Sequence, residues 1–135
     1  MDEILKMIKK IIAIAGLIAF SYSCIGYYPK EVFTPLQDEP ITCNKKDSIV
    51  ALYFEGEPIN FEYEKVGLIE IQGANYDNDS QVISDLKKLA IAKCCDAVIG
   101  IRKGSIEREE GLAFVGDGDF TYKSITYYGI GIRRN

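Results

Sequence analysis

The distribution of hydrophobic and polar residues divides the chain into three parts. Residues 11–20 carry no charge and follow a segment that contains three lysines. Residues 24–46 contain prolines and scattered polar residues without a sustained strand or helix period. From residue 47 onward, short apolar runs alternate with turn residues around one longer amphipathic stretch. We therefore predict a leader at 1–23, an extended tether at 24–46 and a single folded domain at 47–135.

Four segments of the predicted domain have the residue pattern of strands. These are residues 48–54, 64–72, 96–102 and 121–134. Residues 48–54 are apolar on both faces, which is typical of a central strand. The acidic and glycine-containing residues 104–119 predict a loop or an irregular hairpin between the last two strands.

The longer stretch, residues 80–94, predicts a helix. It places Ile83, Leu86, Ala90 and Cys94 on one stripe, and residues before it are good N-caps. The expected fold is α+β, with one main helix packed on a mostly antiparallel sheet of four or slightly more strands in β-β-α-β-β order.

The leader has the order of a lipoprotein signal peptide: basic residues, an apolar run, small residues and then Cys24. The apolar run is shorter than the roughly 20 residues that a membrane-spanning helix needs. Cleavage after Ser23 would leave Cys24 as the N-terminal residue that receives diacylglycerol and palmitate. No acidic residue directly follows Cys24. We therefore expect a lipid anchor in the outer membrane.

Two other outcomes of the leader remain open. Ser21 and Ser23 also fit the small-x-small rule of ordinary signal peptidase, which would give a secreted or soluble periplasmic product. An uncleaved N-terminal anchor is the second alternative.

Composition narrows the function classes. The chain has 16 basic and 20 acidic residues, and the leader holds three lysines and two of the acids, so the mature net charge is −5. This charge argues against nucleic acid as a partner. The chain contains no histidine, the usual general base near neutral pH and the commonest transition-metal ligand. We expect no enzyme activity and no cofactor.

The cysteines allow two further interpretations. Acylation of Cys24 would leave Cys43, Cys94 and Cys95 in an oxidising compartment. Because a bond between adjacent cysteines is strained, a disulfide would join Cys43 to Cys94 or to Cys95. Alternatively, all three stay reduced. We expect Cys94 in the core and Cys95 to be the more accessible thiol.

The same three cysteines are the candidate ligands of a soft metal ion. Cys94 and Cys95 would point about 100° apart on a helix, which hinders a shared ion. We therefore predict no metal site. Tyr127 and Tyr128 are adjacent in one strand and must place one ring on each face of the sheet. They mark the candidate interaction surface.

Several segments in order resemble a small α/β family. They are Lys65-Val-Gly-Leu-Ile-Glu-Ile-Gln-Gly73, Leu86-Lys-Lys-Leu-Ala-Ile-Ala-Lys93, Asp96-Ala-Val-Ile-Gly-Ile101 and Tyr127-Tyr-Gly-Ile-Gly-Ile132. The family includes YbjQ-like proteins, named for heavy-metal binding, and the outer-membrane lipoprotein sensor of the Rcs envelope-stress phosphorelay. The chain has Cys94-Cys95 where the family usually has Gly-Ala. The resemblance implies the fold, an envelope location and a signalling or interaction role.

We thus expect a non-catalytic cell-envelope lipoprotein that interacts with an envelope protein or senses envelope stress. One alternative is a soft-metal-binding or thiol-redox module that uses Cys94, Cys95 and Cys43. Another is a homo-oligomeric assembly subunit, which follows from the oligomerisation of YbjQ-like relatives. Expected partners are the membrane, through the N-terminal lipid, and an envelope protein that the sequence does not identify.

Overall fold

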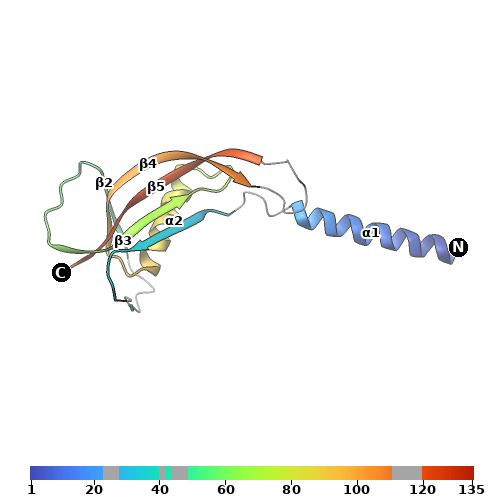
Figure 1. Ribbon diagram of the computed structural model, residues 1–135, viewed down its shortest axis with the longest axis horizontal. Helices are drawn as coiled ribbons and strands as arrows, with labels where there is room; N and C mark the ends of the chain where they lie inside the picture. The colour runs from blue at the N-terminus through green and yellow to red at the C-terminus, as the bar shows by residue number, and fades with distance from the viewer. Residues whose placement is uncertain (23–27, 40–41, 44–48, 111–119) are drawn as a thin grey trace.

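The computed structural model describes residues 1–22, 28–39, 42–43, 49–110 and 120–135. These residues form two helices and five strands, and Figure 1 shows their arrangement. In chain order they are α1 (Asp2–Tyr22), β1 (Lys30–Pro35), β2 (Ala51–Phe54), β3 (Tyr63–Gln72), α2 (Asp79–Ala92), β4 (Ala97–Glu110) and β5 (Phe120–Arg134). Among the described residues, no helix is long and apolar enough to cross a membrane.

The strands form one mixed sheet in the order β1-β3-β5-β4-β2. β3 pairs with β1 and β5, and β5 pairs with β4, all antiparallel, whereas β2 pairs with β4 in parallel. The expected fold, one main helix on a mostly antiparallel sheet of four or slightly more strands in β-β-α-β-β order, is therefore wrong. The element order is α-β-β-β-α-β-β, and the sheet has five strands of mixed direction.

Two strands differ from their predictions in place or length. β2 lies at an edge of the sheet, although its two apolar faces predicted a central strand. Val50 and Leu52 pack on the side of α2, while Ala51 and Tyr53 pack in the cluster on the opposite face. β4 continues to Glu110, so residues 104–110 are strand and not loop. Residues 111–119 of the predicted loop lie outside the described residues.

The sheet also begins earlier than expected. β1 lies inside the segment 24–46, which the sequence analysis assigned to an extended tether. It pairs with β3 from Lys30↔Gln72 to Pro35↔Gly67. Phe33 packs against the main core, and a Cβ atom at Gly67 would overlap its ring. The edge strand is thus part of the folded domain, which starts close to Cys24 in sequence.

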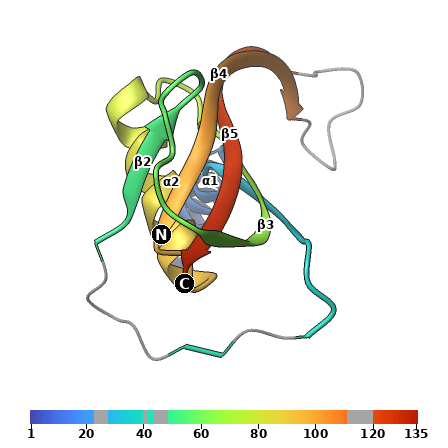
Figure 2. The same ribbon diagram turned by 90° about the vertical axis from the view of Figure 1, so that its left-hand side faces the viewer.

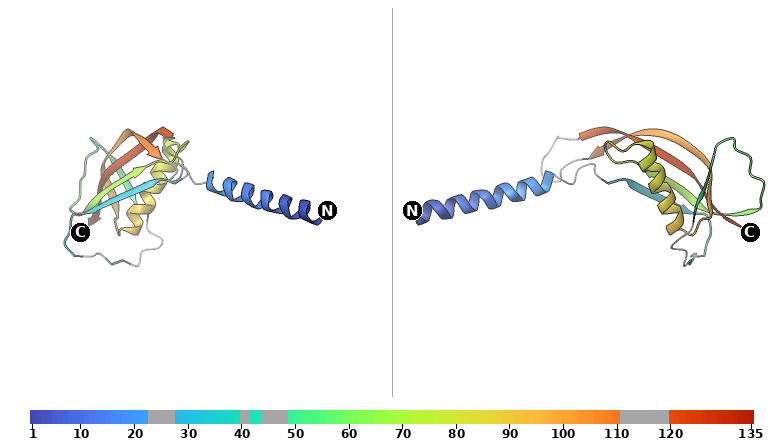
Figure 3. Two further views of the ribbon diagram at one scale, coloured as in Figure 1. Left: turned by 45° about the vertical axis from the view of Figure 1, so that its right-hand side comes forward. Right: turned by 180° about the vertical axis from the view of Figure 1, so that it is seen from behind.

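α2 covers one face of the sheet, as Figure 3 shows. It begins with a capping box, in which the Asn78 side chain accepts from Gln81 N at 3.0 Å and the Gln81 side chain accepts from Asn78 N at 2.9 Å. The buried residues of its inner face are Val82, Leu86, Leu89 and Ala90. They pack on aliphatic residues of β3 and β4 and on Tyr127 of β5.

The connection from β2 to β3 passes over the opposite face (Figure 2). There, Ile59 and Phe61 pack on a smaller cluster of Ala97, Ile99 and Ile132. Arg134 holds this end of the sheet, because its guanidinium lies 4.4 Å from the Phe61 ring centroid and donates to the Tyr53 hydroxyl. Within the part of the chain that the structure describes, no helix covers the rest of this face, away from the connection.

A polar cluster ties the start of α2 to the sheet. The Asp79 carboxylate accepts from the Tyr127 hydroxyl at 2.9 Å and from Lys103 Nζ at 2.9 Å. The hydrogen bonds from Lys103 and then Tyr127 lower the pKa of Asp79 below its ordinary value of 3.8. An acidic residue in the first turn also suits the helix dipole.

This cluster predicts part of the acid sensitivity of the fold. Because the pKa of Asp79 is lower in the folded chain, the unfolded chain takes up the proton first as the pH falls. The stability from this carboxylate is present above about pH 4 and is lost as the pH falls through the folded pKa. We expect Asp79→Asn to lower the urea midpoint at pH 7 and to lower it less at pH 3, where the unfolded chain is already mostly protonated at this residue.

The matched control is Asp85→Asn, which removes the ion pair with Lys88 on α2. The Lys88 side chain is 70% exposed and the Asp85 side chain 19% exposed, so solvent screens this pair at the lysine, and its loss should change the midpoint little at either pH. An Asp79→Asn variant that loses as much stability at pH 3 as at pH 7 would contradict the assignment.

Candidate functional site

Aliphatic side chains form a row across the sheet face opposite α2, from the cluster under the β2–β3 connection outward to β1. In the strand register, Ile99 of β4 lies beside Ile130 of β5, and Ile130 lies beside Leu68 of β3. Thr34 of β1 continues the row beyond Leu68. Leu68 is 46% exposed, a large value for leucine in an inner strand. The row thus presents apolar surface to solvent at Leu68, whereas Ile99 is 6% exposed and lies in the covered cluster.

A second row, two residues away along β3 and β5, consists of polar side chains. Arg102 of β4 neighbours Tyr128 of β5, which neighbours Glu70 of β3. Arg102 also forms an ion pair with Glu55, which follows β2. A hydrogen bond with Tyr128, followed by the Glu55 interactions, raises the pKa of Arg102 above its ordinary value. Gln72 donates to the Glu70 carboxylate at 2.9 Å.

A β-bulge brings the two rows onto the same face. The pairing of β4 with β5 shifts between Ile99 and Arg102, so two residues of β4 oppose one of β5. Gly100 takes a φ of +61°, which favours glycine, and Ile101 turns into the core under α2. Without the bulge, Ile99 and Arg102 would point to opposite faces, because their separation is odd.

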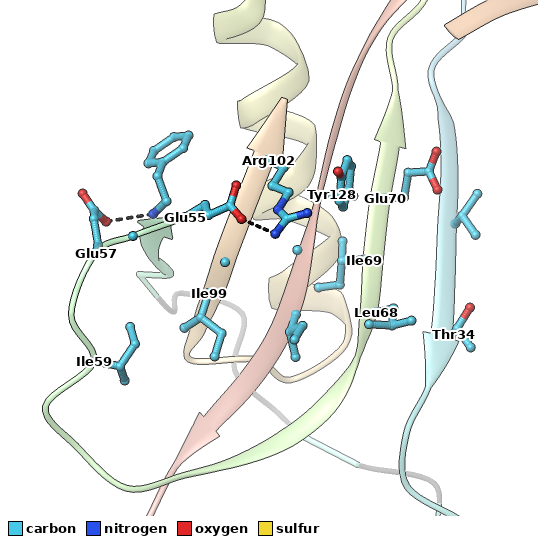
Figure 4. A pocket seen from close by; sticks show the side chains of 16 residues that line it. Thr34, Glu55, Glu57, Ile59, Leu68, Ile69, Glu70, Ile99, Arg102 and Tyr128 are labelled. Atoms are coloured by element: carbon cyan, nitrogen blue, oxygen red, sulfur yellow. Dashed lines mark hydrogen bonds and ion pairs between the residues drawn. The ribbon is translucent and has the colours of Figure 1, made fainter. Parts of the chain in front are cut away.

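The two rows and the chain after β2 enclose a groove of about 610 Å³ (Figure 4). The turn at Glu55–Glu57 forms one wall, and Val32 and Thr34 of β1 form the other. The Glu57 carboxylate accepts from Phe54 N at 2.8 Å, which holds this turn. The ionisable residues that line the groove are Glu55, Glu57, Glu70, Arg102 and Tyr128. Three carboxylates against one guanidinium give the rim an acidic balance.

The two tyrosines of the predicted interaction surface lie on opposite faces. Tyr127 is buried under α2, where its hydroxyl is bound to Asp79. It is therefore not available as a contact residue, which leaves Tyr128 as the candidate contact residue of the pair. Tyr128 is 42% exposed and lines the groove beside Arg102.

The cysteines take different states. A disulfide joins Cys43 to Cys94 with 5.7 Å between their Cα atoms, one of the two pairings left open above. Cys94 has a φ of +63° and is buried just after α2. Cys95 is a free cysteine but is only 1% exposed, so the expectation that it is the more accessible thiol is wrong.

The surroundings of Cys95 make it a poor nucleophile and a poor metal ligand. Burial, followed by the charge of Asp96, raises the pKa of its thiol to about 11. A thiol that stays protonated near neutral pH binds soft metals weakly. Within the described residues, no group of three or more cysteine, aspartate or glutamate side chains could hold a metal ion.

Several groove residues were not identified from the sequence, namely Glu55, Leu68, Glu70, Gly100 and Arg102. Val66 to Ile71 reads as an almost continuous apolar run, which hides the outward position of Leu68. The Gly100 bulge reverses the alternation before Arg102. The signal that was available is Gly100 itself, since a glycine inside an apolar strand suggests a bulge.

Comparison of the chain with protein-family models, curated proteins and solved structures found no significant match. The resemblance to the YbjQ-like and Rcs-sensor family therefore remains a prediction.

The buried thiol gives a direct test of the cysteine assignments. In the mature protein under native, non-reducing conditions, we expect almost no alkylation by iodoacetamide near neutral pH, because Cys95 is protonated and covered. Denaturation should expose one reactive thiol, and denaturation with a reductant should expose three. Mass spectrometry counts the added groups. Rapid native alkylation, or three reactive thiols without a reductant, would contradict this arrangement.

Proposed function

We propose that the mature chain is a non-catalytic lipoprotein domain of the cell envelope, anchored in the outer membrane by lipid on Cys24, that binds another envelope protein. Binding of this kind would serve an interaction or stress-sensing role. The observation that carries the binding part of the proposal is the groove, with its aliphatic floor at Leu68 and its polar row at Arg102 and Tyr128. The leader and Cys24 support the location.

The groove favours one kind of partner segment. Its floor suits an aliphatic or aromatic side chain, because the exposed Leu68 and the partly buried Ile130 beside it offer apolar contact. Its rim carries three carboxylates, and Arg102 is already paired with Glu55. Charge complementarity therefore favours a segment in which a lysine or arginine stands next to the apolar side chain.

Two observations support binding over catalysis. The chain has no histidine to act as general base near neutral pH. In the groove, the interactions with Tyr128 and Glu55 raise the pKa of Arg102, so its guanidinium stays protonated and can orient a ligand but cannot exchange protons.

The alternative functions receive less support. A metal or redox module would use Cys43, Cys94 and Cys95, but the first two share a disulfide and the third is buried and protonated. No observation on the described residues favours a homo-oligomeric assembly over binding of a different protein.

Site-specific photo-cross-linking in intact cells tests the proposal. A benzophenone amino acid would replace Tyr128 in the groove or, as the matched control, Lys87 on the exposed side of α2. We expect a discrete protein adduct from position 128 and none from position 87. Leu68→Lys should abolish the adduct for two reasons. It places a charge on the apolar floor, and this charge occupies the acidic rim in place of the partner's basic group.

The proposal would be wrong if both positions gave the same adducts, or if Leu68→Lys left the adduct from position 128 unchanged. Circular dichroism of the variants checks that they are folded. Leu68 is already 46% exposed, so its replacement should leave the fold intact.

A further inference from the structure

Three segments distant in sequence meet at the end of the sheet where β1 starts and β3 ends (Figure 1). Arg108 of β4 joins them. Its Nη1 donates to Gly73 O at 3.0 Å, to Tyr28 O at 3.3 Å and to Gln72 O at 3.4 Å. Arg108 also lies over the Tyr122 ring at 5.5 Å. Arg108 therefore fixes the backbone just before β1 to the part of the β4–β5 pair that contains Arg108 and Tyr122.

Exposed aromatic rings gather at this end. Tyr28 is 71% exposed and Tyr76, in the turn between β3 and α2, is 92% exposed. The Tyr76 turn is held by bonds between Ala74 and Asp77, of which Ala74 N to Asp77 Oδ2 is 2.6 Å. Tyrosine has an apolar ring with a polar tip, and it is enriched where lipid headgroups meet water.

The position of the lipid acceptor adds an independent constraint. Cys24 precedes Tyr28 by four residues, a separation that spans at most about 14 Å of extended chain. Because β1 begins at Lys30, there is no long tether between the acceptor and the sheet. A lipid on Cys24 would hold this end of the domain at the membrane surface.

We propose that the end of the domain formed by Tyr28, Tyr76, Arg108 and Tyr122 rests in the headgroup layer of a phospholipid membrane. This inference depends on the lipidated Cys24 of the proposed function. The domain then stands on this end with its strands pointing away from the membrane. Tyr128 of the groove lies six residues from Tyr122 along β5, or about 20 Å.

The charges at this end favour neutral headgroups. Glu107 of β4 is the register partner of Lys123 of β5, so opposite charges stand side by side on the ribbon. The mature chain is acidic overall, which disfavours an anionic surface. The contact therefore depends on aromatic insertion into zwitterionic headgroups and should change little with salt.

Tryptophan fluorescence can test this orientation, because the chain contains no tryptophan. The lipidated mature protein would carry Tyr28→Trp or Tyr76→Trp as the single reporter, with Tyr128→Trp as the matched control. Each variant would be reconstituted into phosphatidylcholine vesicles, with and without lipids brominated near the headgroup end of their acyl chains. We expect a blue shift and quenching by bromine at positions 28 and 76, and neither at position 128.

Intact mass of the same samples separates this inference from the proposed function. Acyl mass on the chain with unquenched reporters at 28 and 76, or with equal quenching at 128, would overturn the orientation and leave the lipoprotein proposal standing. A mature chain without acyl mass would overturn both. Quenching at 28 and 76 that disappears in high salt would overturn the assignment to neutral headgroups.

Discussion

The packing of the apolar stripe of α2 against one face of the sheet is the interaction on which the rest of the structure depends. Leu86 and Val82 are fully buried there against residues of β3 and β4. Burial of side chains of this size contributes about 1.5–3 kcal/mol each, which makes this contact the main apolar term of the domain. A single helix covers a single face. The opposite face is therefore left to a short chain segment, Ile59–Phe61, and to solvent.

This asymmetry assigns different roles to the two sides of the same strands. Tyr127 and Tyr128 illustrate it, because one ring anchors the start of α2 through Asp79 and the other lines the groove beside Arg102. The ends of the sheet differ as well. Arg134 closes one end with aromatic rings, whereas Arg108 gathers the start of β1 and the Tyr76 turn at the other. A domain with a lipid near β1 would thus present the groove at a distance from the membrane.

The sequence predicted the elements that depend on local periodicity. β3, α2 and β5 were placed to within two residues at each end, because each combines a long apolar pattern with clear boundaries. β2 was found but misplaced. Side chains on one face of β2 pack with the core under α2, and those on the other face pack with residues 59–61. A strand at the edge of the sheet can therefore be apolar on both faces, and this pattern does not distinguish it from a central strand.

Other features depend on tertiary pairing and had weak local signals. β1 buries only Val32 and Phe33 in part, so its pattern resembles that of a tether. The outer half of β4 is polar except for Ile106 and becomes a strand through its pairing with β5. The groove depends on the bulge at Gly100, which reverses the alternation of side chains along β4. The alternating pattern of the sequence therefore assigns Arg102 to the wrong face of the sheet. β1, the outer half of β4 and the groove could therefore be identified only from the three-dimensional structure.

One measurement tests most directly whether one face of the sheet is buried under α2 and the other is open for binding. It compares the same substitution on the two faces. Leu86→Ala removes a fully buried side chain under α2, and Leu68→Ala removes a half-exposed one from the groove floor. The account predicts that urea unfolding will show a loss of about 2–5 kcal/mol for Leu86→Ala and less than about 1 kcal/mol for Leu68→Ala. Equal losses would mean that the groove face is covered and buried in solution, which would contradict its role as the binding surface.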